Sequence, residues 1–136
     1  MKKNLYHLIL LCLITIGCSS NEESCGCNSP TLNSISDENN VTGNISYKKK
    51  IDGIEEYYID RFWTTVRYSD CANCIDFYIV CNEDILDSSF DTLKESDTNE
   101  FYEVQFSGGL KEVCNKIISP SDVNYNHITL TKIEKL

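Results

Sequence analysis

Cysteine is the residue type through which this 136-residue chain could do chemistry. Eight cysteines are present, and six lie beyond Cys18: Cys25, Cys27, Cys71, Cys74, Cys81 and Cys114. Their spacing allows three kinds of chemistry, namely structural disulfides, a thiol redox pair and a thiolate metal site.

Structural disulfides are the first expectation, because the six cysteines are even in number and, as argued below, belong to an exported chain. Cys81 shares the alternation of Ile79 in a predicted strand, so we expect it to face the core. Cys25 and Cys27 are one residue apart and are not expected to bond each other. They could instead fasten the N-terminal segment to the domain through Cys71 and Cys81.

A redox pair is the first alternative. Cys71-Ala72-Asn73-Cys74 has the C-x-x-C spacing of thiol–disulfide oxidoreductases. In those enzymes a helix follows the motif, and its N-terminus lowers the thiol pKa. Here the run from Ile75 to Val80 predicts a β-strand, which disfavours redox catalysis.

A metal site is the second alternative. Cys25, Cys27, Cys71 and Cys74 supply four thiolates, enough for a tetrahedral zinc or copper(I) site. An oxidising compartment works against reduced thiolates. We therefore expect no metal site and no cofactor, and we keep this four-cysteine metal site as an alternative.

The other side chains carry no catalytic signature. His127 lies in a predicted strand and is the only histidine after residue 17. A single histidine excludes an H-E-x-x-H metal site, and no G-x-S-x-G or phosphate-binding glycine loop occurs either. The net charge of −9 argues against a nucleic-acid partner, because phosphate binding needs clustered lysine and arginine. An exposed Trp63 or tyrosine could form a platform for a glycan or peptide.

The N-terminus predicts export and a lipid anchor. Residues 1–17 combine a basic start with an apolar run, which is the pattern of a secretory signal peptide. Thr15-Ile16-Gly17-Cys18 resembles the lipobox of bacterial lipoproteins, in which a small residue precedes an obligatory cysteine; Thr15 stands where leucine is usual. The resemblance implies cleavage before Cys18 and lipidation there, so that the anchor makes the membrane a partner. It implies an outer-membrane lipoprotein of the cell envelope, facing the periplasm or the surface.

Two further units follow the signal peptide. Residues 18–43 are rich in Ser, Asn, Glu, Thr and Gly, and we expect a lipidated flexible tether. Residues 44–136 are expected to form a single domain.

The pattern of the domain is that of strands. In residues 62–68, 75–81 and 102–106, the side chains expected on one face of a strand alternate with those expected on the other. Residues 127–133 are rich in Ile and Thr. Asp52-Gly53 is a hairpin turn signal between runs at 45–51 and 54–59. Ser107-Gly108-Gly109 is expected to end its strand. These runs predict an all-β, mainly antiparallel fold, a small OB-like barrel or sandwich of five to six strands with one short helix within 84–93.

A family resemblance rests on residues 74–80 and the closing strand 128–136. Small uncharacterised Bacteroidetes lipoproteins with an OB-like barrel are similar: they place a cysteine before a central strand and another after a later strand, and they end in a strand like Leu-x-x-Ile-x-Lys-Leu here. The resemblance implies an envelope location and no assigned activity. It also suggests a bridge between Cys74 and Cys114, which follows a predicted strand and could cross to the central one.

One short motif predicts a modification. Asp91-Thr92-Leu93 matches the three-residue acceptor motif for O-glycosylation in Bacteroidetes, with Thr92 as the acceptor.

Two functions follow from these observations. The first is a membrane-anchored envelope lipoprotein with a non-enzymatic, disulfide-stabilised β module that binds or scaffolds a protein or glycan. The second is a thiol-based metal-binding or redox protein that uses Cys71 and Cys74 with Cys25 and Cys27.

Overall fold

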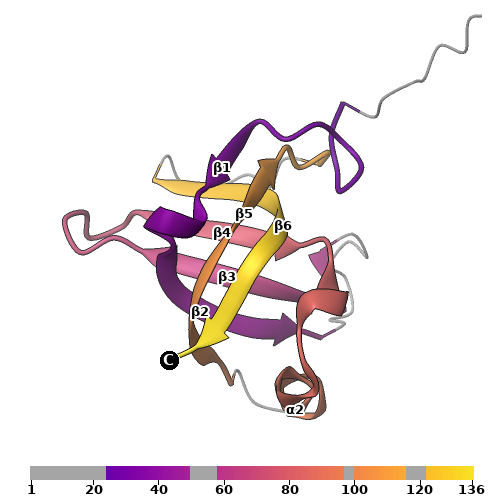
Figure 1. Ribbon diagram of the computed structural model, residues 1–136. Coiled ribbons are helices and arrows are strands. Elements are labelled where there is room, and N and C mark those ends of the chain that lie inside the picture. The colour runs from indigo at the N-terminus through magenta and orange to yellow at the C-terminus, as the bar shows by residue number, and fades with distance from the viewer. Residues whose placement is uncertain (1–23, 50–57, 97–99, 116–121) are drawn as a thin grey trace, which may run out of the picture.

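The fold is a small β-barrel. The computed structural model describes residues 24–49, 58–96, 100–115 and 122–136, and every structural statement below concerns these residues. The six strands are β1 (Asn33–Ile35), β2 (Val41–Lys48), β3 (Arg61–Arg67), β4 (Ile75–Val80), β5 (Tyr102–Lys111) and β6 (Val123–Lys135) (Figure 1).

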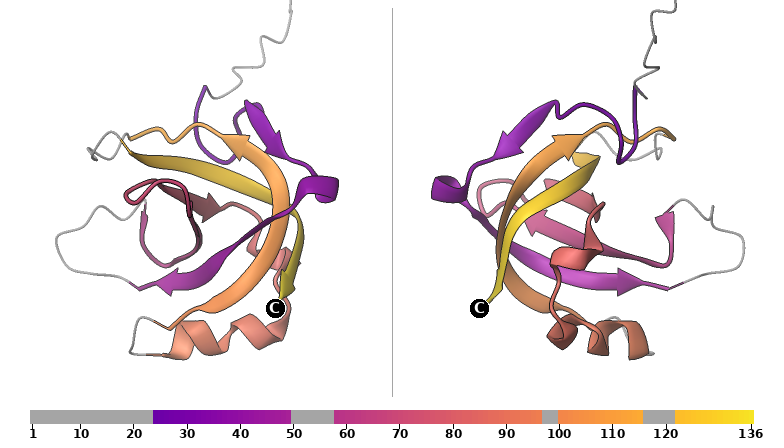
Figure 2. Two further views of the ribbon diagram at one scale, coloured as in Figure 1. Left: turned by 90° about the vertical axis from the view of Figure 1, so that its left-hand side faces the viewer. Right: turned by 45° about the vertical axis from the view of Figure 1, so that its right-hand side comes forward.

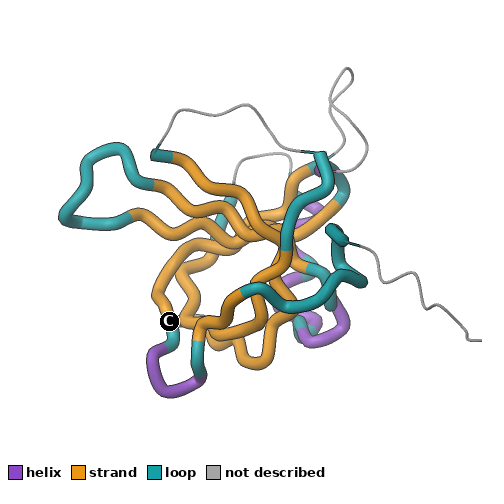
Figure 3. Tube along the Cα trace, turned by 90° about the horizontal axis from the view of Figure 1, so that it is seen from above, coloured by secondary structure: helices purple, strands orange, loops and turns teal. Residues whose placement is uncertain are grey.

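Five of these strands close the barrel. Their order is β5-β2-β3-β4-β6, and β6 pairs back with β5, while β1 extends the sheet beyond β5. All pairings are antiparallel except β4 with β6, which is parallel. This arrangement confirms the predicted all-β, OB-like fold (Figure 3).

The barrel interior is apolar and follows the predicted alternation of β3. Phe62 and Val66 are buried, and Thr64 between them is fully buried as well. Burying one large apolar side chain contributes roughly 1.5–3 kcal/mol. The other strands, a 3₁₀ turn and the short helix complete this interior with Ile45, Tyr78, Val80, Phe90, Leu93, Val104, Phe106, Ile128 and Leu130.

A second apolar cluster covers the outer surface of β3 and β4. It contains Trp63 and Ile79, with Phe77 packed against them, while Val80 points to the interior. Cys81 follows β4 in the phase of Ile79, which belongs to this second core cluster, so it is directed to that cluster and not to the barrel interior; it is half-buried. Both faces of β4 carry apolar side chains, and alternation alone therefore did not identify the inner one.

Strand β5 continues through the glycines that were expected to end it. It pairs with β6 along its length, with a register shift between Ser107 and Gly108. A Cβ atom on Gly108 would lie 2.5 Å from the carbonyl oxygen of Thr129, so only glycine allows this close approach of the two strands.

The helical elements are short. Three 3₁₀ turns span Asp37–Asn39, Glu83–Ile85 and Ser88–Phe90, and the helix α2 spans Thr92–Glu95. The predicted short helix is thus present, but it begins at the end of its predicted range, at Thr92, and extends beyond that range to Glu95. No helix in the described ranges is long and apolar enough to cross a membrane.

The N-terminal segment, residues 24–40, belongs to the domain. The prediction placed residues 18–43 in a flexible tether, but strand β1 pairs with β5, and β2 already begins at Val41. Two disulfides also fix this segment, so its polar composition did not indicate its order. It lies at the opposite end of the barrel from α2 (Figure 2). The predicted signal peptide 1–17, Cys18 and the Asp52-Gly53 turn lie outside the described residues.

Candidate functional site

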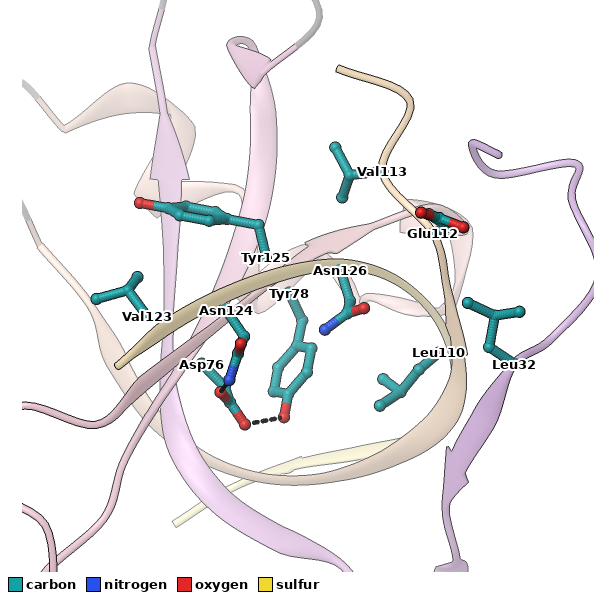
Figure 4. A pocket seen from close by; sticks show the side chains of 10 residues that line it. All are labelled: Leu32, Asp76, Tyr78, Leu110, Glu112, Val113, Val123, Asn124, Tyr125 and Asn126. Atoms are coloured by element: carbon teal, nitrogen blue, oxygen red, sulfur yellow. Dashed lines mark hydrogen bonds between the residues drawn. The ribbon is translucent and has the colours of Figure 1, made fainter. Parts of the chain in front are cut away.

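A cavity of about 420 Å³ opens where β4, β5 and β6 come together (Figure 4). Ligand pockets in proteins fall in the range of about 300–1,000 Å³, so the cavity has the size for a small ligand. We call it the Asp76 cavity; its lining residues are Leu32, Asp76, Tyr78, Leu110, Glu112, Val113, Val123, Asn124, Tyr125 and Asn126.

The parallel register of β4 and β6 brings the polar residues of the cavity together. Asp76 pairs with Asn124, and Tyr78 pairs with Asn126. Partners in register project to the same side of a sheet, so two amide side chains lie beside a carboxylate and a phenol. Figure 4 shows the Tyr78 hydroxyl and the Asn126 amide pointing into the same space.

Asp76 organises this polar group by accepting three hydrogen bonds. The hydroxyls of Tyr68 and Tyr78 both donate to its Oδ2, at 2.6 and 3.0 Å. The amide Nδ2 of Asn124 donates to Oδ1 at 2.9 Å. Each hydroxyl that donates to Asp76 keeps its oxygen lone pairs available to accept from a ligand.

Both tyrosines stay protonated. Burial, followed by the negative charge of Asp76, raises the pKa of Tyr78 far above its usual value of 10.0. For Tyr68 the hydrogen bond to Asp76 is the largest cause that raises the pKa. The two phenols therefore remain fixed donors to Asp76 across the neutral range.

Apolar and acidic groups form the other walls. Leu110 and Val113 line one side, and Leu32, which is 66% exposed, stands at the rim. Glu112 adds a second carboxylate to that of Asp76. A cavity with such walls suits a neutral ligand that carries hydroxyl groups and an apolar face, and it repels anions.

A second hollow lies on the outer side of β2 and β3. It measures about 540 Å³ and includes Arg67, Phe77 and Phe101, of which Phe101 is 58% exposed. Its hydrogen-bonding groups lack the organisation that Asp76 gives the first cavity. Trp63 does not form an exposed platform, because it is buried and its Nε1 donates to the carbonyl oxygen of Tyr58 at 2.9 Å.

The six cysteines form three disulfides, as expected for structural cysteines. The pairs are Cys25–Cys114, Cys27–Cys81 and Cys71–Cys74. As predicted, Cys25 and Cys27 do not bond each other, and of the two suggested links from this pair to Cys71 and Cys81, the one to Cys81 is present, through Cys27. The suggested Cys74–Cys114 bridge was wrong, and so was a bridge from the N-terminal segment to Cys71, because Cys71 and Cys74 bond each other within one turn.

The pairing also contradicts the four-cysteine metal site. Cys25, Cys27, Cys71 and Cys74 do not converge, since the first two bond cysteines elsewhere in the chain. Strand β4 begins directly after Cys74, so this C-x-x-C has no helix at its end to lower a thiol pKa.

His127 has an environment that the sequence did not reveal. It lies in β6, as predicted, but it is fully buried, and its Nδ1 lies 3.6 Å from the Sγ of Cys27. Burial, followed by the positive charge of Arg61, lowers the pKa of His127 below its usual value of 6.5. Cys27, Cys81 and His127 together form a group that could hold a metal ion.

Thr92 is exposed at the start of α2, and its hydroxyl lies 2.6 Å from that of Tyr102. O-glycosylation at this residue stays a prediction.

No model of a protein family and no curated protein matches the chain. The Asp76 cavity and the cysteine pairs must therefore be interpreted from their own geometry.

Proposed function

We propose that the chain is an exported lipoprotein, anchored through Cys18, whose disulfide-stabilised barrel binds a neutral saccharide in the Asp76 cavity. The proposal assigns the barrel a binding role without catalysis. The observation that carries it is the carboxylate of Asp76, which accepts hydrogen bonds from two phenols and one amide at the edge of a cavity of ligand size.

The chemistry of a sugar matches this arrangement. A sugar ring presents hydroxyls that both donate and accept, and it has an apolar face of C–H groups. Tyr78 offers an oriented oxygen atom, and the amides of Asn124 and Asn126 offer donors and acceptors. The side chain of Leu110 provides an apolar surface for the other face of the ring.

Exposed apolar side chains lie at the cavity and beside it. The described residues expose four large apolar side chains; one of them lines the cavity, and a second is hydrogen-bonded to Asp76 from outside the cavity lining. Leu32 lines the cavity, and Tyr68 donates to Asp76. Apolar surface that remains exposed beside oriented polar groups is typical of a binding site.

The anchor is supported by the sequence of the N-terminus. A basic start, an apolar run and the Gly17-Cys18 pair are what lipoprotein processing requires. Several acyl chains on Cys18 would hold the chain firmly on a bilayer, at about 0.8 kcal/mol for each buried methylene. Labelling cells with a fatty-acid analogue tests this step. The wild type should carry the label and the Cys18→Ala variant should not; equal label on both would reject the anchor.

Saccharide binding is tested with the full chain in detergent on an array of neutral and anionic glycans. We expect neutral glycans to bind and the Asp76→Ala variant to lose binding. Phe101→Ala, which alters the second hollow, is the matched control and should bind like the wild type. Loss of binding in Phe101→Ala with retention in Asp76→Ala would move the site to the outer side of β2 and β3.

A further inference from the structure

Cys27, Cys81 and His127 bring three metal-ligating atoms together from distant parts of the chain. The two sulfurs and a ring nitrogen of the histidine all lie within 4.8 Å of one another. We propose that reduction of the Cys27–Cys81 bridge opens a site for a thiophilic metal ion, with the two thiolates and Nδ1 of His127 as ligands.

The position of the imidazole matches metal coordination. Nδ1 of His127 lies 3.6 Å from Sγ of Cys27. A tetrahedral zinc ion with usual bond lengths places a nitrogen and a sulfur ligand about 3.6 Å apart, and two sulfur ligands roughly 3.8 Å apart. The histidine is therefore already at ligand distance from Cys27, and opening the bridge requires the two sulfurs to move apart from bond length to ligand separation.

The backbone around both cysteines is fixed by bonds other than this bridge. Lys111 donates through Nζ to the carbonyl oxygen of Cys27 at 2.5 Å, and the N–H of Gly26 donates to the carbonyl oxygen of Glu112 at 2.7 Å. The N–H of Cys81 donates to the carbonyl oxygen of Ile128, next to His127, at 2.8 Å. Reduction therefore leaves the three ligands near one another.

The charge of the site suits two thiolates. Lys111 and Arg61 both act on His127 as nearby positive charges, and positive charge favours thiolate over thiol. Two thiolates and a neutral imidazole bring a divalent ion to a net charge of zero, which favours its burial. Cys27 and Cys81 are half-buried, so a small reductant can reach the bridge.

The reaction balances with a dithiol as reductant. The dithiol transfers two electrons and two protons to the bridge, which becomes two thiols, and the dithiol leaves as a disulfide. The metal ion then replaces the two thiol protons, which pass to solvent. Oxidation of the thiols reverses this sequence and releases the ion. The site is distinct from the Asp76 cavity and does not depend on saccharide binding.

The test uses the full chain with Cys25→Ser, Cys71→Ser, Cys74→Ser and Cys114→Ser, so that Cys27–Cys81 is the one bridge that reduction opens among the described residues. The chain is reduced with dithiothreitol and freed of it without oxygen, and its fold is checked by the fluorescence of Trp63. Zinc is then titrated against a chromophoric chelator, and copper(I) against a copper(I)-specific chelator. We expect one ion per reduced chain with at least one of these metals, none per oxidised chain, and at least tenfold weaker binding in His127→Leu.

A second measurement covers the case in which the serine variants do not fold. The wild-type chain is reduced and alkylated with and without the metal, and the modified cysteines are identified by mass spectrometry. We expect the metal to slow alkylation of Cys27 and Cys81 but not of the other four cysteines, which are Cys25, Cys71, Cys74 and Cys114. A folded reduced chain that binds neither metal, binding that His127→Leu leaves unchanged, or equal protection of all six cysteines would overturn the proposal.

Discussion

The N-terminal segment and the region from Tyr68 to Asp76, which joins β3 to the start of β4, contain the same chemical groups in different surroundings. Each contains cysteines in disulfides and one aspartate that accepts hydrogen bonds from two hydroxyls. In the N-terminal segment Asp37 accepts from Ser107 and Thr131. At the other region Asp76 accepts from Tyr68 and Tyr78.

The difference lies in what these groups join. Asp37 connects the N-terminal segment to β5 and β6, and the bridges of this segment reach over 54 and 89 residues of sequence. The bridge Cys71–Cys74 spans only three residues, and Asp76 faces a cavity. We conclude that one region fastens the chain to the barrel, whereas the other shapes a binding site.

The largest expected effect is on stability in the N-terminal segment. The double variant Cys25→Ala/Cys114→Ala should lower the free energy of unfolding by about 4 kcal/mol, because the bridge closes a loop of 89 residues. Urea denaturation followed by circular dichroism measures the change. A loss below about 1 kcal/mol would contradict the fastening role.

The matched change in the other region should have a smaller effect. Cys71→Ala/Cys74→Ala removes a bridge that closes a loop of only three residues. Loop-closure entropy then predicts that the free energy of unfolding falls by about 1.5 kcal/mol. The same urea titration compares the two variants. If this variant is destabilised as much as the first, the comparison between the two regions fails.

The smallest effect is a dependence on pH in the N-terminal segment. The hydrogen bonds from Ser107 and Thr131 lower the pKa of Asp37 below its usual value of 3.8. The unfolded chain therefore binds this proton at a higher pH than the folded chain. The stabilisation is complete above pH 3.8 and is lost as the pH falls through the lower folded pKa.

Melting temperatures measured between neutral and strongly acidic pH test this dependence. Asp37→Asn should melt with a shallower dependence on pH than the wild type in the acidic range. Parallel curves would show that Asp37 contributes nothing to the attachment of the segment.

Local pattern was enough to predict the strands but not the closure of the barrel. The alternation of Phe62, Thr64 and Val66 indicated the inner face of β3, because burial on one face leaves a period of two. Gly108 was interpreted as a strand end, since the close approach of Thr129 that requires glycine comes from β6, a distant part of the chain.

The candidate site depended even more on contacts between distant residues. Asp76 is one of 21 acidic residues, and a carboxylate at its position in an alternating strand is usually exposed to solvent. Only the parallel pairing with β6 places Asn124 beside it. The position of His127 next to Cys27 joins residues 100 apart in sequence. The one available signal in the sequence was a single histidine in a predicted strand, and it did not indicate a partner.

The most direct test of the account compares the two aspartates as ligand-binding groups. The dissociation constant of the neutral glycan that binds best is measured by calorimetry for the wild type, Asp76→Asn and Asp37→Asn. Both variants remove one carboxylate that accepts hydroxyl hydrogen bonds, so they are matched in chemistry. The account predicts at least tenfold weaker binding for Asp76→Asn and an unchanged constant for Asp37→Asn. Equal constants for all three proteins would contradict it.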